Sequence, residues 1–253
     1  MNRFTDNVVL ITGGGTGIGR ATALAFAREG ATVVLAGRRL QPGEQTVALL
    51  RQQGGQGRFV QTDVTQEAEV RALLEQIRTD YGRLDIAFNN AGVLGPVGSV
   101  IELREDDWDS TIAVNLKGTW LSMKYEIPQM LRQGRGVIVN MSSVIGARVA
   151  SPHLAAYTAA KAGVLAVSRA AALEYSAAGI RIHVVSPGPV RAPMSQRADE
   201  TEDERDRRVA ASLPIGRIGD AEEVARAVLW LSSEEAALAV GQDLVLDGGV
   251  SLS

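Results

Sequence analysis

Short runs of Val, Ile and Leu alternate along this chain with longer segments that have helical spacing. Such short apolar runs are typical of buried parallel strands, and the longer segments are typical of helices that cover both faces of a sheet. The pattern therefore predicts an α/β fold with a Rossmann-type, doubly wound parallel sheet of about seven strands. We expect these strands at residues 8–11, 32–36, 57–62, 84–88, 136–141, 180–186 and 243–246.

The organisation between these strands predicts one domain over residues 1–253. No Pro-, Ser- or Gly-rich linker, internal repeat or low-complexity tract divides the chain. Residues 17–29 have the spacing of an amphipathic helix that ends at Gly30. One dense charge run, residues 197–208, holds six acids and four arginines. It is interpreted as a solvated helix or, alternatively, as part of a mobile substrate lid over residues 190–213.

Composition excludes several function classes. The chain has no Cys, and His153 and His183 lie too far apart for a paired histidine motif, so we expect no metal site. A net charge of −3 does not suit nucleic-acid binding, and no apolar run reaches the ~18 residues of a membrane span. The first seven residues are polar and do not resemble a signal peptide. We therefore expect a soluble cytoplasmic protein without nucleic-acid or membrane partners.

A glycine-rich loop follows the first predicted strand and opens the first predicted helix, with the sequence TGGGTGIG at residues 12–19. A strand-to-helix turn directs unpaired backbone N–H groups and the positive end of the helix dipole toward one point, which suits a pyrophosphate. Glycines at Gly13, Gly17 and Gly19 let the backbone approach such a ligand closely. The loop predicts a dinucleotide site, whereas a tight structural turn is the alternative.

The residue after the second strand indicates which dinucleotide is preferred. An acid there commonly binds the adenosine ribose, but this chain has Gly37, Arg38 and Arg39. A guanidinium can bind a 2′-phosphate in a bidentate manner, so Arg38 favours NADP(H) over the alternative, NAD(H). Against this, Thr16 adds no second cation to the loop, and Arg38 could stack on adenine in an NAD(H) enzyme. Arg39 is interpreted as a plain surface residue.

Tyr157 and Lys161 are the strongest candidates for catalysis. They are four residues apart in an Ala-rich helical stretch, so their side chains leave one face of the helix one turn apart. The chain has only three lysines and four tyrosines, which makes a chance pairing at this spacing improbable. An ammonium close to a phenol stabilises the phenolate and lowers its pKa. Such a tyrosine can exchange a proton with an alcohol oxygen.

Together these motifs resemble the short-chain dehydrogenase/reductase family in its form of roughly 250 residues, over essentially the whole chain. Further motifs that carry the resemblance are Asp63-Val64, Asn89-Asn90-Ala91-Gly92, Asn115, Ser142-Ser143 and Pro187-Gly188. The resemblance implies that Tyr157 is the proton donor or acceptor, that Lys161 lowers its pKa and holds the cofactor ribose, that a serine orients the substrate oxygen and that Asn115 supports a water-linked proton path. A structural role, bonding its side chain to the backbone, is the alternative for Asn115.

Ser143 is the preferred candidate for that serine, because it opens a Ser-x-x-Gly turn as the family's serine does, while Ser142 is expected to brace the strand end. The catalytic set is thus Asn115, Ser143, Tyr157 and Lys161. The expected cofactor-binding residues are Gly13, Thr16, Gly17, Ile18, Gly19, Arg38, Asp63, Val64, Asn90, Ala91, Gly92, Tyr157, Lys161, Pro187, Gly188 and Val190. The alternative for the Asn90–Gly92 segment is a purely structural turn.

Ala192 departs from the family, which often has a Thr four residues after the glycine that corresponds to Gly188. In the family, this Thr bonds to the carboxamide or the pyrophosphate of the cofactor. Here that hydrogen bond, worth roughly 1 kcal/mol, is either absent or supplied by Ser195. The expected pocket walls make a mainly apolar site for a ketone or secondary alcohol, and they are Leu94, Val144, Ile145, Val149, His153, Pro189 and Met194. For His153, a position at the rim or on the surface is the preferred interpretation. Family analogy and the Ala-rich stretch from Ala155 to Ala178 imply a homotetramer.

The sequence predicts an oxidoreductase that transfers a hydride between a nicotinamide cofactor and a ketone or secondary alcohol. One alternative is a nucleotide-binding regulatory or scaffold protein that kept the fold without turnover. Another keeps Ser and Tyr for lyase or dehalogenase chemistry without nicotinamide. The complete catalytic set argues against the first, and the uninterrupted glycine loop argues against the second. The physiological substrate and the preferred direction are not determined.

Overall fold

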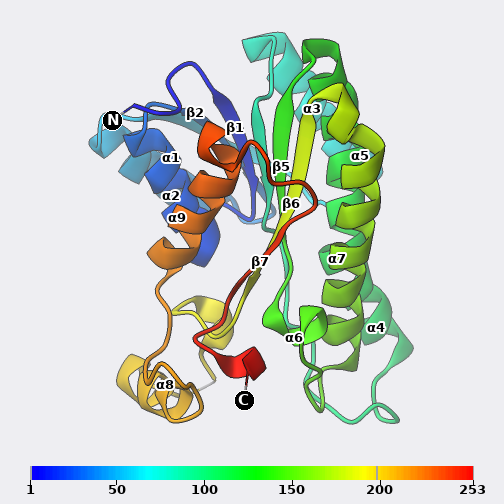
Figure 1. Ribbon diagram of the computed structural model, residues 1–253. Helices are drawn as coiled ribbons and strands as arrows, with labels where there is room; N and C mark the ends of the chain where they lie inside the picture. The colour runs from blue at the N-terminus through cyan, green and yellow to red at the C-terminus, as the bar shows by residue number, and fades with distance from the viewer. Residues whose placement is uncertain (1, 198, 253) are drawn as a thin grey trace.

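A computed structural model describes residues 2–197 and 199–252. Its centre is a parallel sheet of seven strands in the order β3-β2-β1-β4-β5-β6-β7 (Figure 1). The predicted Rossmann-type doubly wound sheet is therefore confirmed. The strands are β1 (Val8–Thr12), β2 (Thr32–Gly37), β3 (Gln56–Gln61), β4 (Ile86–Asn89), β5 (Gly136–Met141), β6 (Ile180–Pro187) and β7 (Asp243–Leu246).

Helices cover both faces of the sheet. One hydrophobic cluster joins it to α1, α2 and α9, and a second joins it to α3, α5 and α7 on the opposite face. The α-helices are α1 (Gly17–Arg28), α2 (Leu40–Gln52), α3 (Glu67–Tyr81), α4 (Glu105–Ile112), α5 (Gly118–Gln133), α6 (Val144–Ala147), α7 (Ala155–Tyr175), α8 (Glu202–Ala210) and α9 (Ala221–Ser232). A π-helical segment, η1 (Ala113–Lys117), joins α4 to α5, and short 3₁₀ turns are η2 (Ser176–Ala178), η3 (Pro193–Ser195), η4 (Glu234–Ala236) and η5 (Val250–Leu252).

The predicted boundaries differ from the observed ones by one or two residues. The largest difference is at β4, which was expected to begin at Leu84 and begins at Ile86. The side-chain amide of Gln133 explains this, because its Oε1 accepts from the Leu84 N–H and its Nε2 donates to the Leu84 carbonyl. Leu84 therefore bonds to the end of α5 instead of joining the sheet ladder.

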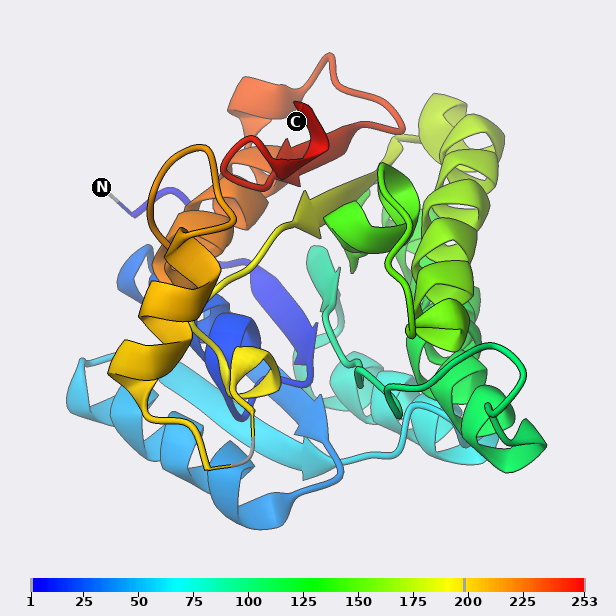
Figure 2. The same cartoon turned by 90° about the horizontal axis from the view of Figure 1, so that it is seen from below.

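The strand order reverses between β1 and β4, and the carboxyl ends of both strands face the same side of the molecule. Figure 2 looks at this side and shows the loop after β4, α6 and the segment that follows β6 arranged around the ends of the strands. In doubly wound sheets a ligand binds at such a reversal point. Among the described residues, no helix is long and apolar enough to cross a membrane.

Candidate active site

The glycine loop is a tight cradle between β1 and α1. Gly13 and Gly17 have φ values of +67° and +52°, which a residue with a Cβ rarely adopts. At Gly19 the constraint is contact, because a Cβ there would lie 2.3 Å from the Gly13 carbonyl oxygen. The loop therefore needs glycine at these positions for two different physical reasons. A backbone free of side chains at this point fits the pyrophosphate of a dinucleotide.

Asn90 fixes the shape of this cradle from the neighbouring strand. Its side-chain Nδ2 donates to the carbonyls of Thr12 and Gly13 at 3.0 and 3.2 Å. In the other direction, the Thr12 hydroxyl accepts from the backbone N–H groups of Asn90 and Ala91. The loops after β1 and β4 thus form one unit. The contacts of Asn90 are those of a residue that shapes the loop.

Tyr157 and Lys161 lie on α7, as the spacing predicts, and both are buried. The ammonium nitrogen of Lys161 is 5.7 Å from the centroid of the Tyr157 ring and donates to the Met141 carbonyl at 2.8 Å. Met141 is the last residue of β5, so its carbonyl lies at the carboxyl edge of the sheet. The end of this strand therefore holds the lysine beside the tyrosine.

The two adjacent serines point in different directions, as expected. The Ser142 hydroxyl donates to the Lys161 main-chain carbonyl at 2.8 Å, which braces α7 against the end of β5. Ser143 instead caps α6 by accepting from the Ile145 N–H at 3.2 Å, and it lines the same cavity wall as Tyr157. The turn that begins at Ser143 lies directly on α7, since a Cβ on Gly146 would be 2.6 Å from the Thr158 carbonyl oxygen.

Burial dominates the acid–base behaviour of this pair in the free protein. It raises the pKa of the Tyr157 phenol, although the hydrogen bond with Ser143 acts in the opposite direction. Burial also lowers the pKa of the Lys161 amine from its ordinary value to about 8. Burial thus shifts each group toward its uncharged form, because a charge is poorly solvated here, although a pKa of about 8 still leaves Lys161 mainly an ammonium at neutral pH. The phenol therefore carries its proton in the free protein. The net shift of the Tyr157 pKa is upward, opposite to the lowering by Lys161 that was expected from the sequence.

Asn115 lies in the π-helical segment η1 and is fully buried. Its side chain accepts from the Val93 N–H and donates to the carbonyls of Val93 and Thr111. A Cβ on Gly92 would lie 2.8 Å from the Asn115 Oδ1 and 3.5 Å from the Lys161 ammonium nitrogen. Asn115 therefore sits close to the lysine, and its contacts hold the loop after β4 against the helix.

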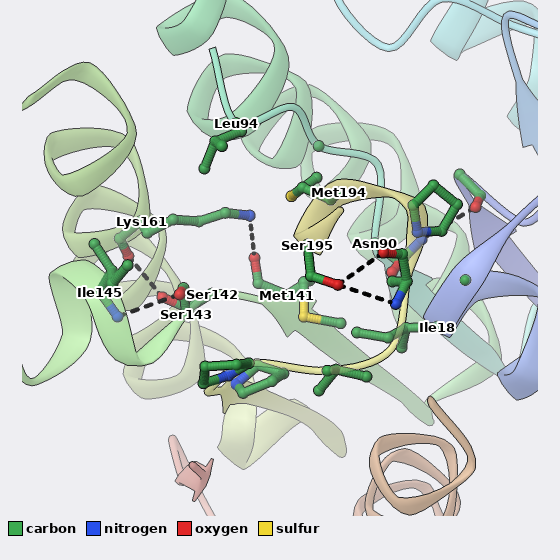
Figure 3. A pocket seen from close by; sticks show the side chains of 18 of the residues that line it. Ile18, Asn90, Leu94, Met141, Ser142, Ser143, Ile145, Lys161, Met194 and Ser195 are labelled. Atoms are coloured by element: carbon green, nitrogen blue, oxygen red, sulfur yellow. Dashed lines mark hydrogen bonds between the residues drawn. The ribbon is translucent and has the colours of Figure 1, made fainter. Parts of the chain in front are cut away.

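A cavity of about 440 Å³ brings most of the predicted site together. In Figure 3, Lys161 and Ser143 lie at one end, Asn90 and Ile18 at the other, and Ser195 between them. The lining residues are Gly13, Thr16, Gly17, Ile18, Arg39, Asn90, Ala91, Gly92, Leu94, Met141, Ser142, Ser143, Val144, Ile145, Tyr157, Lys161, Pro187, Gly188, Pro189, Val190, Ala192, Pro193, Met194 and Ser195.

A second cavity of about 120 Å³ shares the glycine loop and Gly92 with the first and extends toward β2 and β3. Arg38, Asp63 and Val64 line it, as a site for the adenosine end of a dinucleotide requires. Among the predicted cofactor residues, Gly19 lines neither cavity, and Asn115 of the catalytic set does not either. Both act through the close contacts described above.

Arg39 is the main residue that the sequence interpretation missed. It was taken as a plain surface arginine, but it lines both cavities, and its Nη2 lies 3.5 Å from the Thr16 hydroxyl. Because α2 begins at Leu40, Arg39 is the N-cap residue, and its extended backbone precedes the helix. In the sequence, Arg39 differs from Arg38 in lying one residue closer to the start of α2, and this position is the signal that could have identified it.

The segment after β6 packs on the glycine loop. A Cβ on Gly17 would lie 3.2 Å from the Ala192 Cβ, and the Ser195 hydroxyl donates to the Ala192 carbonyl at 2.8 Å. Ser195 thus closes its own turn, η3, in this structure. Earlier in the same segment, Gly188 is required by contact, since a Cβ there would be 2.7 Å from the Asp247 Cα.

The charge run of residues 197–208 includes a capped helix beside this segment. Thr201 and Glu204 form a capping box at the start of α8. Arg191 pairs with Asp206 in α8 and with Asp220 at the start of α9, while Arg208 pairs with Glu200. These ion pairs connect α8 to the segment over the cavity.

The predicted apolar walls are partly correct. Leu94, Val144, Ile145, Pro189 and Met194 line the large cavity. Val149 does not, and the prediction for it is wrong, and His153 does not line it either. His153 is exposed, and its carbonyl accepts from the Gly98 N–H on the outer loop, so it has the rim position preferred for it.

Comparisons with known proteins agree with this geometry. The model of a family described as enoyl-(acyl carrier protein) reductase matches residues 13–251. A short-chain type dehydrogenase/reductase from Mycobacterium marinum has a crystal structure that covers 100% of this chain and 98% of its own, with a TM-score of 0.92 and 29% identity. This chain belongs to the short-chain dehydrogenase/reductase family.

Two relatives extend this assignment. Cyclohexanol dehydrogenase from Acinetobacter sp. (strain SE19) is 38% identical over 247 residues, which are 98% of this chain and 96% of the relative. The crystal structure of levodione reductase has a TM-score of 0.94 and 34% identity, and the match covers 99% of this chain and 100% of the other. As a member of the short-chain dehydrogenase/reductase family, the chain is an NAD(P)(H)-dependent oxidoreductase that acts on small alcohols or ketones. A non-catalytic scaffold is not supported.

Proposed function

We propose that this enzyme interconverts neutral, mainly apolar ketones and secondary alcohols, with NADP(H) as the favoured cofactor. One observation carries the proposal: Tyr157 and Lys161 lie one helical turn apart on the wall of a cavity that the glycine loop and Ser143 also line. A proton donor and a dinucleotide cradle thus open into the same space.

The residues present fit a nicotinamide dinucleotide. Gly13, Gly17 and Gly19 leave the space that a pyrophosphate needs, and the small cavity extends from them toward Asp63 and Val64. The remaining contacts would come from Thr16, Ile18, Asn90, Ala91, Gly92, Pro187, Gly188 and Val190, each in the wall of a cavity. When bound, the nicotinamide supplies or accepts the hydride.

We assign a distinct task to each catalytic side chain. Tyr157 donates a proton to the carbonyl oxygen during reduction and accepts it during alcohol oxidation. Ser143 orients that oxygen through its hydroxyl. Lys161 offsets the negative charge of the phenolate and binds the ribose hydroxyls of the cofactor. Asn115 acts by holding the loop after β4, and a water-linked path past Lys161 is its further proposed role.

The walls of the cavity support the substrate class. Leu94, Val144, Ile145, Pro189 and Met194 are apolar, and among the described lining residues only Arg39 and Lys161 carry charge. Arg39 lies at the glycine loop and Lys161 bonds to Met141, so neither is free to bind a substrate carboxylate at the apolar end. Cyclohexanol, named for one relative, is a neutral secondary alcohol of this kind.

A panel of carbonyl compounds and alcohols tests the proposal. We expect NADPH-dependent reduction of neutral cyclic ketones, with kcat/KM about tenfold or more above that for ketones of similar size that carry a carboxylate, because burying an unpaired charge is costly. Each compound is assayed spectrophotometrically with NADPH and with NADH. Equal kcat/KM for the neutral and the charged ketones would contradict the substrate class, and no turnover with any carbonyl compound or alcohol would contradict the function.

The cofactor preference rests on two arginines. Arg38→Ala and Arg39→Ala are each expected to raise the KM for NADPH about tenfold or more, because a charge-assisted hydrogen bond contributes roughly 1.5–3 kcal/mol. The KM for NADH should change less than about twofold. Arg51→Ala on the outer side of α2 is the matched control and should change neither value. If the wild-type enzyme bound NADPH and NADH equally well, the preference for NADP(H) would be wrong.

Three further expectations remain proposals. Residues 1–253 are taken as one domain, in which residues 190–213 act as a substrate lid; the packing of Ala192 on Gly17 and the ion pairs of Arg191 support this. A homotetramer is proposed by family analogy, and sedimentation as a monomer at micromolar concentration would contradict it. A cytoplasmic location rests on the sequence alone.

A further inference from the structure

A buried polar cluster lies behind the active site, on the sheet face that α5 and α7 cover. It consists of Glu126 on α5, Asn89 on β4, Asn140 on β5 and Ser168 on α7, each at most 2% exposed. None of these side chains lines either cavity described above. The proposed chemistry makes no use of them, although a carboxyl group buried this deeply is costly when it is ionised.

The four side chains form a continuous chain of hydrogen bonds. The Asn89 Nδ2 donates to the Glu126 Oε2 at 3.0 Å and to the Asn140 Oδ1 at 2.9 Å. The Asn140 Nδ2 then donates to the Ser168 hydroxyl at 2.8 Å. Two strands and two helices are therefore joined through polar groups in an otherwise apolar interior.

Within this cluster of four side chains, two oxygens lack a hydrogen-bond partner among the described residues, the Asn89 Oδ1 and the Glu126 Oε1. They belong to the same pair of side chains, which already share one N–H to O bond. When the carboxyl is ionised, neither oxygen carries a proton, so neither can donate a hydrogen bond to the other. A proton on the Glu126 Oε1 would give that oxygen something to donate and the Asn89 Oδ1 something to accept. One such bond would satisfy both of the buried oxygens that lack a partner.

Among the residues that the structure describes, no charged group acts on Glu126 to stabilise its carboxylate. The neighbours on β4, β5 and α7 are two amides and a hydroxyl, and His183 on β6 points to the opposite sheet face, as Val185 does. On α5, Lys124 and Tyr125 both bond to Glu67. On α7, Lys161 bonds to Met141. Burial raises the pKa of Glu126 to about 8, with Asn89 acting weakly in the opposite direction.

The cluster is connected to the active site through the next residue on each strand. Asn89 precedes Asn90, which shapes the glycine loop, and Asn140 precedes Met141, which holds the Lys161 ammonium. Ser168 lies two helical turns beyond Lys161 on α7, so its bond to Asn140 fixes the position of that helix against β5. The register between α7 and the two strand ends thus depends on this chain of bonds.

We propose that Glu126 is a neutral carboxylic acid that donates its proton to the Asn89 side chain and acts as a positioning residue for the helix that carries Lys161. The positioning part rests on the proposed function of Lys161, whereas the protonation part does not. Glu126→Gln is the decisive variant, because a neutral amide can donate to the Asn89 Oδ1 and accept from its Nδ2 in the same places.

Protonation is tested without any assay of activity. Infrared spectra of the wild-type protein near neutral pH should contain the C=O stretching band of a protonated carboxyl, and this band should be absent from Glu126→Gln. Between about pH 5 and 8 the folded protein holds a proton that the unfolded chain has released, so wild-type stability falls as pH rises. The Tm of Glu126→Gln should therefore exceed that of the wild type by a margin that grows over this range, by about 5 °C or more, and then levels off.

Positioning is tested by kinetics at neutral pH. Glu126→Gln should keep kcat within about twofold of the wild type, whereas Glu126→Ala should lower kcat about tenfold with little change in the ketone KM, since the cavity walls stay in place. Ser168→Ala, which breaks the chain at its other end, should lower kcat in the same way and serves if Glu126→Ala does not fold. Gln129→Ala is the matched control, a buried polar residue of α5 outside the cluster, and should leave kcat unchanged.

Two results would overturn the inference. If the wild-type protein lacked the infrared band, or if the Tm difference between Glu126→Gln and the wild type were the same at every pH, Glu126 would be ionised. If Glu126→Ala and Ser168→Ala folded and kept the wild-type kcat, the cluster would be structural only. Failure of the proposed function itself would appear differently, as a Lys161 variant with normal kinetics.

Discussion

Tyr157→Phe is expected to lower kcat for ketone reduction by about 10²–10⁴-fold, the range that a positioned general acid contributes. The variant keeps the aromatic ring of this buried residue and loses only the hydroxyl. Its fold and its cofactor affinity should therefore be nearly those of the wild type. Steady-state NADPH oxidation with a saturating ketone measures kcat, and fluorescence titration with NADPH measures cofactor affinity.

Tyr125→Phe is the matched control for this variant. Its hydroxyl bonds to Glu67 at the surface of α5 and α3, and its removal should leave kcat within about twofold of the wild type. Wild-type turnover by Tyr157→Phe would contradict the proposed mechanism. So would a large loss of cofactor affinity that accounted for the entire effect.

The pH dependence of ketone reduction follows from the same pair. Reduction needs Tyr157 with its proton and Lys161 as an ammonium, and both groups lose a proton as pH rises. The pKa of Lys161 is lowered to about 8 by burial, while that of Tyr157 is raised, so Lys161 is the first to be lost. The rate should therefore fall as pH rises past about 8.

Lys161→Met should lower kcat/KM for ketone reduction by about 10²-fold or more and should also raise the KM for NADPH, since the lysine is assigned both to the phenolate and to the ribose. Met has a similar length but cannot donate to the Met141 carbonyl, which accepts from the ammonium at 2.8 Å in the wild type. Loss of this hydrogen bond costs about 1 kcal/mol, but the variant also no longer buries an amine, which is unfavourable in itself. These two contributions oppose each other, so the Tm should change by only a few degrees.

Lys124→Met provides the comparison, because Lys124 bonds to Glu67 on the exposed side of α5. It should have wild-type kinetics with both cofactors. A Lys161→Met enzyme with unchanged kcat and an unchanged KM for NADPH would show that the ammonium has neither task. If Lys161→Met lowered kcat but left the KM for NADPH unchanged, Lys161 would stabilise the Tyr157 phenolate but would not bind the cofactor ribose.

Local sequence signals identified most of the fold and the site. The alternation of apolar runs and helical segments predicted the parallel sheet, because strands that are covered on both faces must be apolar throughout. The four-residue spacing of Tyr157 and Lys161 predicted their common helix face, because helix geometry alone sets it. The Ser-x-x-Gly turn distinguished Ser143 from Ser142, and the two hydroxyls do point in different directions.

Contacts between distant parts of the chain were predicted less completely. Arg39 was interpreted as a surface residue, because its neighbours in sequence do not reveal that the N-terminus of α2 lies beside Thr16. Val149 was expected in the pocket wall but does not line the large cavity. The effect of Lys161 on Tyr157 was expected from charge alone, whereas burial decides the direction of the pKa of both groups.

The sequence by itself determined the fold class, the glycine cradle and the Tyr157–Lys161 pair, because each depends on a periodic pattern or on spacing within one element. Only the tertiary structure decided that the Met141 carbonyl holds the lysine and that Asn90 shapes the loop after β1. It also brought Glu126, Asn89, Asn140 and Ser168 into one buried cluster. Burial and hydrogen bonding between elements arise from packing, and residues 20 or more positions apart carry no local signal of their contact.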